Sequence, residues 1–549
     1  MSISARHTLL ALWAVAGCVR GPAGEPAPVG GADLLIRGGT VYDGSGGPPF
    51  AADIVVAGDS VLSVDRTRRA AARDTLDARG LAVAPGFVNM LSWGYDELLR
   101  DGRGESDLRQ GVTLEIFGEG QSPGPVNARV ARELLARGDT VPQWGFGEAL
   151  DSLAARGISL NVASFVGATT LRLHEIGADD RPPTPGELAR MQELVRRAME
   201  EGALGVGTSL IYPPASYSTT AELVVLARAS APYGGMYISH LRGEGDRLLE
   251  AADELIDIAR QAGVPGEIYH IKAAGADNWG KFDALLAKVD SARAAGLRIS
   301  ADMYTYPASS TGLTSRFPTW AEAGGFDSLL ARLGDPGARV RIEAESDFRD
   351  PAGVLLVGFR APALRAMQGK TLAEVARERC VSPAVAAMDL IAEDRSRVGV
   401  VFFSMAEENV RKAVRTPWVS FGSDGGAWTL ADSVPVNATH PRAYGNFARL
   451  LGRYVREERL IPLEEAVRRL SALPAANLGL PRRGRLAPGY LADAVVFDPA
   501  TIADRATYER PHQYAVGVRH VVVNGTPALR DGEITPARAG RVVRGRGAR

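Results

Sequence analysis

The chain has 549 residues, of which 46% are hydrophobic and 23% are charged, and these values are typical of a folded globular protein. Its 63 basic and 64 acidic residues leave a net charge of -1, so no overall basic field points to nucleic acid as a partner. Only two cysteines occur, which excludes a disulfide scaffold and a cysteine-cluster zinc site. We therefore expect a protein of enzyme size that buries a large core.

The first 18 residues have the features of an export signal. Arg6 and His7 precede the apolar stretch Leu9–Ala16, which is too short to cross a bilayer. Small residues and then Cys18 follow, an order that resembles the lipobox of bacterial lipoproteins, in which this cysteine is lipidated. We expect residues 1–18 to be a lipoprotein signal peptide and residues 19–31 a Gly/Pro/Ala-rich tether, with the protein facing the periplasm and touching the membrane only through its lipid anchor. The alternative is an ordinary cleaved signal and a secreted protein.

Patterns typical of β-hairpins occur at both ends of the remaining chain. Short β-branched runs separated by Gly-Asp and Gly-Gly turns begin near Asp33, and similar runs return at Ala492–Asp498 and Arg519–Gly525. We expect residues 32–84 and 485–549 to form one small composite β-sandwich domain.

Between these ends, residues 85–484 alternate short apolar runs with amphipathic helical segments. The predicted strands include Ser159–Ser164, Gly235–His240, Glu267–His270 and Arg298–Asp302, and the predicted helices include Arg247–Ala262 and Lys281–Ala295. This α/β alternation predicts a (β/α)8 TIM-like barrel, in which the active site lies at the carboxyl ends of the strands. Residues at about 312–360 break the alternation, so we expect an inserted subdomain there.

Two of the seven histidines, His240 and His270, end predicted strands that are one strand–helix unit apart. A barrel would bring both side chains to the same mouth, which favours a metal site, most plausibly zinc, although a single histidine is more often structural. Asp424 follows a further apolar strand and lies beside glycines. It is expected to be a general base acting on water, the alternative being a helix cap.

Ordered motifs from about residue 33 to the end resemble those of the N-acyl-D-amino-acid deacylases, the D-aminoacylases of the amidohydrolase superfamily. The motifs are APGF (Ala84–Phe87), QGVTLE (Gln110–Glu115), NVASFVG (Asn161–Gly167), EGALGVGTSLIYPPASY (Glu201–Tyr217), SHLRGE (Ser239–Glu244), YHIKAAG (Tyr269–Gly275), FGSDGG (Phe421–Gly426) and HPRAYGNFARLLGRYVRE (His440–Glu457). The resemblance implies an amidohydrolase-type barrel that contains zinc, a small β-sandwich, and hydrolysis of the amide bond in N-acyl-D-amino acids.

The resemblance also implies roles for individual residues. His240 and His270 match the zinc-binding histidines of the family, and Asp424 matches its catalytic aspartate. Lys272 and Tyr212 match residues that bind the substrate carboxylate. Lys272 is one of only five lysines in the chain, and an ammonium facing a carboxylate is a lysine-specific use. Tyr212 could instead serve packing alone.

The chain departs from the family pattern at three places. Leu91 and Trp93 stand where the family has a His-x-His motif, and Ala168 replaces a histidine. The cysteine ligand of the family is also missing, and Glu119 is the only nearby group able to bind a metal. We therefore expect one tightly bound zinc held by Glu119, His240 and His270, and no binuclear centre. Glu119 could alternatively cap a helix or face solvent.

Three functions remain open on these grounds. The first is hydrolysis of N-acyl-D-amino acids or related D-configured amides or dipeptides, with a small carboxylate-bearing molecule as the substrate. The second is hydrolysis of a cyclic amide or carbamoyl substrate on the same fold. The third is an inactive binding lipoprotein that uses the barrel mouth.

Overall fold

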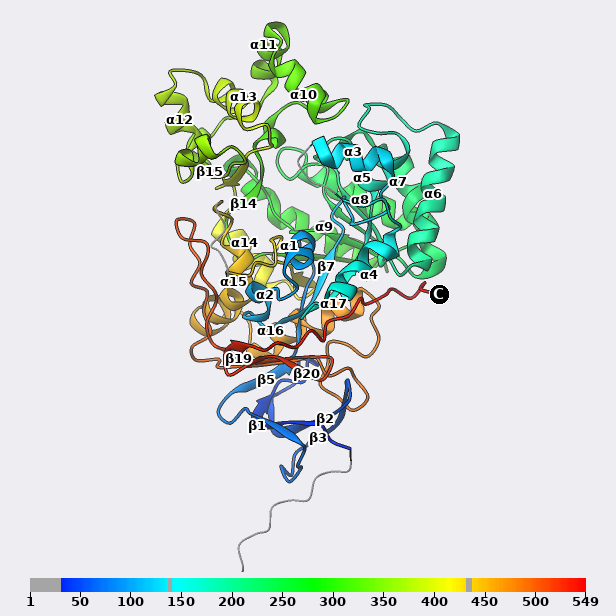
Figure 1. Cartoon of the computed structure of the whole chain (residues 1–549), viewed down its shortest axis with the longest axis vertical. Coiled ribbons are helices and arrows are strands. Elements are labelled where there is room, and N and C mark those ends of the chain that lie inside the picture. The colour runs from blue at the N-terminus through cyan, green and yellow to red at the C-terminus, as the bar shows by residue number, and fades with distance from the viewer. Residues whose placement is uncertain (1–30, 137–140, 431–436) are drawn as a thin grey trace, which may run out of the picture.

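The computed structural model describes residues 31–136, 141–430 and 437–549 (Figure 1). The expected signal peptide, the expected lipidation site Cys18 and all of the expected tether except Gly31 lie outside the described residues. Within the described part of the chain, none of the helices combines the length and apolar character that crossing a bilayer requires.

A ring of parallel strands forms the centre of the molecule. Its strands are β6 (Phe87–Asn89), β7 (Val112–Phe117), β8 (Asn161–Ser164), β9 (Val166–Gly167), β10 (Gly205–Ser209), β11 (Met236–His240), β12 (Gly266–Ile268), β13 (Ile299–Met303) and β17 (Val419–Phe421). They pair in parallel as β6-β7-β8 and as β9-β10-β11-β12-β13-β17. The two sheets are continuous through the chain at Phe165, and the Met90 N–H donates to the Phe421 carbonyl at 3.2 Å between β6 and β17. The predicted (β/α)8 architecture is confirmed.

Helices cover the outside of this ring. Helices α7 (Thr220–Ser230), α8 (Leu248–Ala262) and α9 (Phe282–Ala294) follow β10, β11 and β12 in turn. In α8 the buried residues recur at the spacing of one helix face, from Leu248 through Leu255 to Ala262, and the helix ends at Gly263, whose φ of 72° is left-handed. All five residues of β11 are buried, as expected for a parallel strand covered on both faces.

The remaining barrel helices complete this layer. They are α1 (Tyr95–Arg100), α2 (Glu105–Leu108), α3 (Ala128–Ala136), α4 (Phe146–Arg156), α5 (Ala168–Glu175), α6 (Pro185–Glu200), α14 (Glu407–Arg415), α15 (Arg442–Arg449), α16 (Leu463–Leu470) and α17 (Ala472–Asn477). Helix α15 continues as a π-helical segment, Leu450–Glu457.

Strands from both chain ends form a separate nine-stranded sheet among the described residues. Its members are β1 (Leu34–Val41), β2 (Phe50–Ala57), β3 (Ser60–Asp65), β4 (Asp74–Asp77), β5 (Ala82–Pro85), β18 (Ala494–Phe497), β19 (Val518–Val523), β20 (Thr526–Arg530) and β21 (Glu533–Ile534). The two ends join where β5 pairs with β18. The composite origin agrees with the prediction, and hydrogen bonding links these strands into one continuous sheet.

The C-terminal tail leaves this sheet after Ile534 instead of staying in it to residue 549 as expected. It runs along the barrel, where the Val162 N–H donates to the Arg541 carbonyl at 3.0 Å and the Val543 N–H donates to the Val162 carbonyl at 2.7 Å. Arg- and Gly-rich, the tail lacks the alternating apolar pattern that distinguishes a strand from a connecting segment.

The inserted subdomain extends from Ser309 to Phe402, beyond the expected end near residue 360. It contains β14 (Ser309–Gly312), β15 (Val354–Gly358) and β16 (Gly399–Phe402) in an antiparallel sheet, and the helices α10 (Phe326–Leu333), α11 (Pro336–Glu345), α12 (Leu372–Glu378) and α13 (Pro383–Asp394). Its buried residues form their own core around Leu356 and Val400. The second half was missed because α12 and α13 have the same amphipathic pattern as barrel helices.

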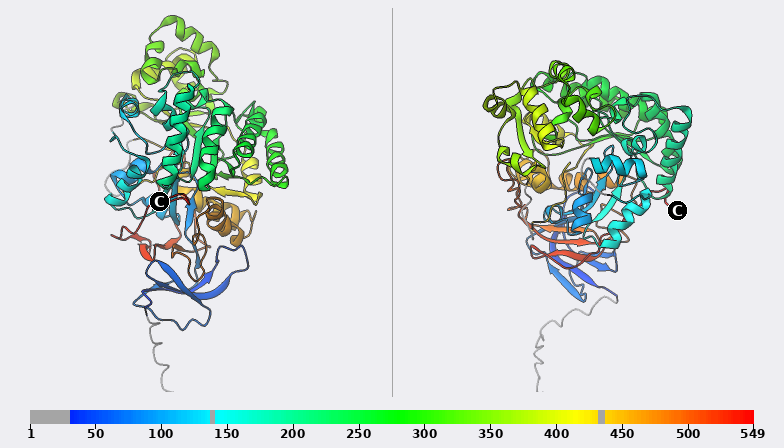
Figure 2. Two further views of the ribbon diagram at one scale, coloured as in Figure 1. Left: turned by 90° about the vertical axis from the view of Figure 1, so that its right-hand side faces the viewer. Right: turned by 45° about the horizontal axis from the view of Figure 1, so that its top comes forward.

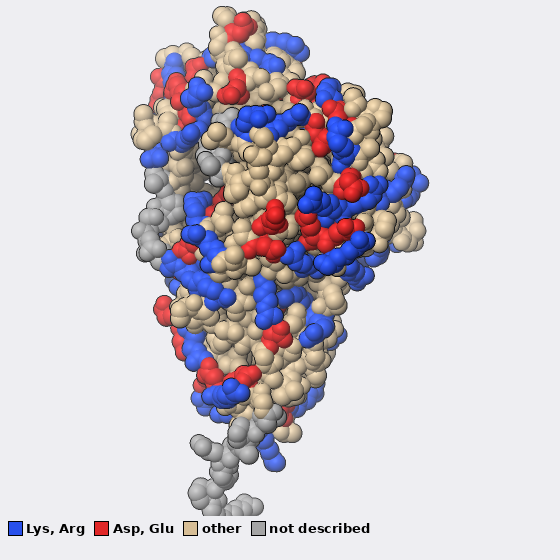
Figure 3. Space-filling view, turned by 45° about the vertical axis from the view of Figure 1, so that its right-hand side comes forward, with Lys and Arg blue, Asp and Glu red and all other residues tan. Residues whose placement is uncertain are grey.

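The insertion and the sheet of the chain ends lie on opposite sides of the barrel (Figures 1 and 2). Since β14 directly follows β13, the insertion rises from the carboxyl ends of the barrel strands. On the face drawn in Figure 3, basic and acidic side chains are intermixed. The side of the barrel that faces the insertion is therefore where the predicted site residues should meet.

Candidate metal centre and active site

A cavity of about 880 Å³ opens at the carboxyl ends of the barrel strands. It is lined from the barrel by Trp93, Glu119, Tyr212, His240, Glu244, His270, Lys272, Tyr304, Asp424 and Arg442, and from the insertion by Thr311, Arg316 and Arg397. Every site residue predicted for the barrel therefore reaches this one cavity. The insertion supplies a wall that the sequence did not predict.

Glu119 reaches the cavity from a tight turn after β7. It lies between Gly118 and Gly120, whose φ angles of 110° and 69° are left-handed. A Cβ atom on Gly120 would lie 2.2 Å from the Ser209 hydroxyl oxygen, so only glycine allows the turn to pack this closely against β10.

Glu119 and the two predicted histidines converge in the structure. The Glu119 Oε1 atom lies 3.1 Å from His240 Nδ1 and 3.1 Å from His270 Nε2. All three residues are buried, and their ligand atoms lie within 4.8 Å of one another. One carboxylate oxygen and two imidazole nitrogens are donors that zinc accepts, so this donor set fits the predicted ion.

The charges at these three residues favour a cation between them. Burial alone would raise the pKa of Glu119, but the two histidines lower it to about 2. Burial and the Lys272 ammonium lower the pKa of His270, and the Glu119 and Glu244 carboxylates outweigh them and raise it to about 10. The ion-free site therefore keeps a proton on His270 at neutral pH, in a place where a metal ion could supply the positive charge.

Glu244, to which the sequence analysis gave no role, contacts the outer nitrogens of both histidines. Its Oε1 atom lies 3.3 Å from His270 Nδ1, and its Oε2 atom lies 3.5 Å from His240 Nε2, which has no hydrogen-bond partner among the described residues. A carboxylate behind a histidine fixes the ring orientation and is a common feature of metal sites. The spacing of four residues from His240 was a usable signal, because the motif SHLRGE contains both.

Lys272 lies behind His270 and contacts protein atoms with its ammonium group. The Nζ atom is 2.5 Å from Glu244 Oε1, 2.6 Å from His270 Nδ1 and 3.0 Å from the His270 carbonyl oxygen. The carboxylate and the carbonyl oxygen accept from Nζ, and at 2.6 Å only one proton fits between Nζ and His270 Nδ1. Binding of a substrate carboxylate by Lys272 stays a prediction, and the structure adds a contact with Glu244 and His270.

Tyr212 connects the barrel to the insertion. Its hydroxyl donates to Thr311 Oγ1 at 2.9 Å, and its ring centroid lies 5.5 Å from that of His240. The Arg397 guanidinium lies 5.0 Å from the Tyr212 ring centroid. Tyr212 thus faces the cavity beside His240, and its binding of a substrate carboxylate stays a prediction.

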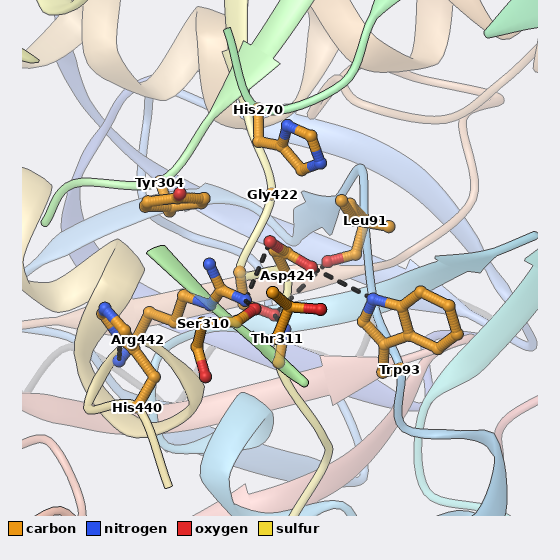
Figure 4. Close-up of polar contacts among 12 residues, drawn as sticks. Leu91, Trp93, His270, Tyr304, Ser310, Thr311, Gly422, Asp424, His440 and Arg442 are labelled. Carbon is orange, nitrogen blue, oxygen red and sulfur yellow. Dashed lines mark hydrogen bonds and ion pairs between the residues drawn. The ribbon is translucent and has the colours of Figure 1, made fainter. Parts of the chain in front are cut away.

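Asp424 lies across the cavity at the end of β17, where two side chains contact its carboxylate (Figure 4). The Trp93 indole Nε1–H donates to Oδ1 at 3.0 Å, and Arg442 Nη2 forms an ion pair with Oδ2 at 2.8 Å. Burial raises the pKa of Asp424, and the Arg442 guanidinium opposes that rise. The remaining Nε and Nη1 atoms of Arg442 are buried and have no hydrogen-bond partner among the described residues.

Two of the site residues have a left-handed backbone that non-glycine residues rarely adopt. The φ angle is 49° at Asp424 and 36° at His270. Such a conformation costs about 1–2 kcal/mol per residue. The Asp424 N–H donates to the Leu91 carbonyl at 2.8 Å, and the His270 N–H donates to Asp302 Oδ1 at 3.0 Å. These bonds hold both side chains toward the cavity.

Comparison with known proteins identifies the family of the chain. Residues 74–528 match the model of the amidohydrolase family. The D-aminoacylase of Alcaligenes xylosoxydans xylosoxydans is 35% identical over 515 residues, which cover 93% of this chain and 97% of that protein.

Solved structures give the same result at the level of the fold. A D-aminoacylase described as having a binuclear metal centre, with one-metal activation and second-metal attenuation, superposes with a TM-score of 0.80 at 33% identity over 93% of this chain and all of that one. The N-acyl-D-glutamate deacylase of Bordetella bronchiseptica, in complex with zinc and a phosphonate inhibitor, superposes with a TM-score of 0.78 at 32% identity, over 93% of this chain and 99% of that chain. Coverage is nearly complete in both directions, so the chain belongs to the amidohydrolase family and, within it, to the group of the D-aminoacylases.

Proposed function

We propose that the protein hydrolyses the amide bond of N-acyl-D-amino acids with the help of one bound zinc ion. The observation that supports this most directly is the meeting of Glu119, His240 and His270 in the same cavity as Asp424. The relatives named above act on N-acyl-D-amino acids or are called D-aminoacylases, and one of them was solved with zinc.

Glu119 Oε1, His240 Nδ1 and His270 Nε2 would hold the ion, and three protein ligands leave a coordination position open. Zinc bound in this way supplies Lewis-acid chemistry that polarises the amide carbonyl and makes water more nucleophilic. Two positions at which the family has histidines are Leu91 and Trp93 here, which supports a single ion. The one-metal activation described for the D-aminoacylase relative agrees with this proposal.

Asp424 would move the proton in this reaction. Its carboxylate accepts a proton from the attacking water while the water oxygen bonds to the amide carbon. The same group then gives the proton to the amide nitrogen as the carbon–nitrogen bond breaks, which releases a carboxylic acid and the free amine of a D-amino acid. The nitrogen needs this proton because an amide anion is a poor leaving group.

The substrate carboxylate would bind to the cationic side of the cavity. We propose Lys272 and Tyr212 for this role, as the resemblance implies, and the structure adds Arg442 through its two unpartnered donors. Fixing the carboxylate orients the amide relative to Asp424, and orientation of this kind lowers the barrier to reaction.

Paired enantiomers test the proposed function. We expect purified protein with about one zinc per chain to hydrolyse N-acetyl-D-amino acids much faster than their L-enantiomers, with release of the free amine as the readout. Glu119→Ala and His270→Ala should each lose the zinc and the activity together. Zinc-loaded protein that leaves all N-acyl-D-amino acids intact but opens hydantoins would contradict the proposal, and two tightly bound zinc ions would contradict the single site.

We also propose that the protein is anchored to a bacterial membrane through lipid on Cys18, facing the periplasm. The order of a short apolar stretch, small residues and cysteine supports this proposal. Cells fed a labelled fatty acid should label the parent protein but not Cys18→Ser. Equal labelling of the two proteins would rule the anchor out.

A further inference from the structure

The two oxygens of Asp424 are bonded by two different protein donors. Trp93 Nε1–H donates to Oδ1 at 3.0 Å, and Arg442 Nη2 lies 2.8 Å from Oδ2 (Figure 4). One donor comes from the segment after β6 and the other from α15, on the far side of the carboxylate. The orientation of the carboxylate is therefore fixed at both oxygens by side chains of this chain.

The Trp93 indole is held in place by backbone pairing with the Asp424 loop. The Trp93 N–H donates to the Gly425 carbonyl at 2.9 Å, and the Asp424 N–H donates to the Leu91 carbonyl at 2.8 Å. Ser92 and Gly425 form a parallel bridge between these two bonds. The segment of residues 91–93 thus continues the pairing of β6 with β17 and brings the indole beside the carboxylate.

Packing alone does not account for tryptophan at this position. The Trp93 side chain is 44% exposed, although the residues around it, Leu91 and Ser92, are buried. An exposed indole that faces a cavity contributes little to the core, and within the described part of the chain the indole N–H has Asp424 as its hydrogen-bond partner. A hydrogen bond from an indole N–H to an ionised carboxylate is stronger than a hydrogen bond between two neutral groups.

We propose that Trp93 is a positioning residue for Asp424, and that Trp93 and Arg442 together orient this carboxylate by protein donors, so that no second metal ion is needed to do so. This proposal rests on the proposed function in assigning proton transfer to Asp424. Each carboxylate oxygen has two acceptor positions, so one donor on each still leaves a position for the proton of water. The Arg442 guanidinium also places a positive charge where it disfavours a second cation beside Asp424.

The substitution Trp93→Phe removes the indole N–H and keeps an aromatic ring. We expect kcat to fall by about 10- to 100-fold, as for a charged hydrogen bond of 1.5–3 kcal/mol, with little change in KM. Loss of a donor to the ionised form raises the pKa of Asp424, so the acid limb of the kcat profile should move to higher pH. Zinc content should stay at the wild-type value.

Trp144→Phe is the matched control. Trp144 is not among the residues that line the cavity, and its Nε1–H donates at 2.8 Å to the Pro123 carbonyl instead of to a carboxylate. The same chemical change should leave kcat within about twofold and the acid limb unmoved, because no titrating group loses a donor. An equal effect of the two substitutions would overturn the proposal, and so would a Trp93→Phe enzyme with unchanged kcat and pH profile.

A measurement without substrate separates this proposal from the proposed function. The difference in fluorescence between wild type and Trp93→Phe isolates the Trp93 indole, and it should titrate in one step that Asp424→Asn abolishes. A difference signal that does not titrate would overturn the contact even if the enzyme is active. This titration step would also occur if the protein hydrolysed another amide. That result would contradict the proposed substrate but not the contact between Trp93 and Asp424.

Discussion

The two sides of the cavity differ in how their charges are balanced. On the metal side, Glu119, His240 and His270 point their ligand atoms at one another, and a proton on His270 supplies the positive charge in the absence of an ion. On the acid side, Asp424 already has a cation, because Arg442 forms an ion pair with it.

This difference indicates where an added cation is needed. A buried carboxylate costs free energy unless a positive charge is paired with it. On the metal side, an ion can replace the proton on His270. On the acid side, Asp424 is paired with Arg442, whose guanidinium cannot lose its charge. The arrangement therefore favours one ion on the side of Glu119. The predictions below test the two sides separately, beginning with the largest expected effect.

The acid side is tested most strongly by Asp424→Asn. This change removes the proton acceptor at nearly constant shape, so turnover should fall by about 10²- to 10⁴-fold. Zinc content should not change, because Asp424 is not among the converging ligand atoms. Steady-state kinetics and elemental analysis on one sample check both statements. An active Asp424→Asn enzyme would show that another group moves the proton.

Two roles are considered for Lys272, and the substitution Lys272→Ala distinguishes them. If the ammonium binds the substrate carboxylate, kcat/KM should fall by tens- to thousands-fold, in line with about 2–5 kcal/mol for a buried charge partner, at unchanged zinc affinity. If it serves mainly to hold Glu244, zinc affinity should fall instead. Substrates with an amidated carboxylate provide the control, because only the first role makes them insensitive to the substitution.

Glu244→Gln tests the outer contacts of the metal side. Glu244 contacts His240 and His270 without being among the converging ligand atoms, so the expected effect is a loss of about 10- to 100-fold in zinc affinity. Competition with a chelator measures this affinity. Glu254→Gln is a control with the same chemical change, since Glu254 pairs with Arg242 away from the three ligand residues. Equal zinc affinity in Glu244→Gln and wild type would count against an orienting role.

Local patterns in the sequence predicted the barrel and three of the candidate site residues, and the family resemblance added Glu119, Lys272 and Tyr212. Apolar runs mark parallel strands, and polar residues at their ends identify the mouth, which located His240, His270 and Asp424. Contacts between distant segments gave no such signal. Trp93 and Asp424 are 331 residues apart, and Tyr212 and Thr311 are 99 apart.

The extent of the insertion and the role of Glu244 were both missed because each depends on which segments lie next to each other in the folded chain. The helices α12 and α13 of the insertion bury one face against their own small core, and this pattern is the same as that of a helix packed on the barrel. The role of Glu244 was missed although the motif SHLRGE contains both Glu244 and His240, because spacing in the loop after β11 does not show where a side chain points. Periodicity identifies which residues are buried but not what covers them.

The smallest expected effect concerns the proton that zinc displaces on the metal side. The pKa of His270 is raised to about 10 because the Glu119 and Glu244 carboxylates outweigh the opposing effects of burial and of Lys272. A metal ion needs the neutral imidazole, so between pH 7 and 9 its binding must release this proton. Apparent zinc affinity should therefore rise about tenfold per pH unit in this range, and it should level off as the pH passes about 10.

Calorimetry in buffers of different ionisation enthalpy measures this proton directly. We expect about one proton released per zinc bound at pH 8 in the wild type. Glu244→Gln should release less, because losing one of the two carboxylates lowers the pKa of His270 toward its ordinary value. Binding enthalpies that do not depend on the buffer would mean that His270 is already neutral in the ion-free protein. In that case the metal side would not rely on a proton, and the contrast with the acid side would rest on Arg442 alone.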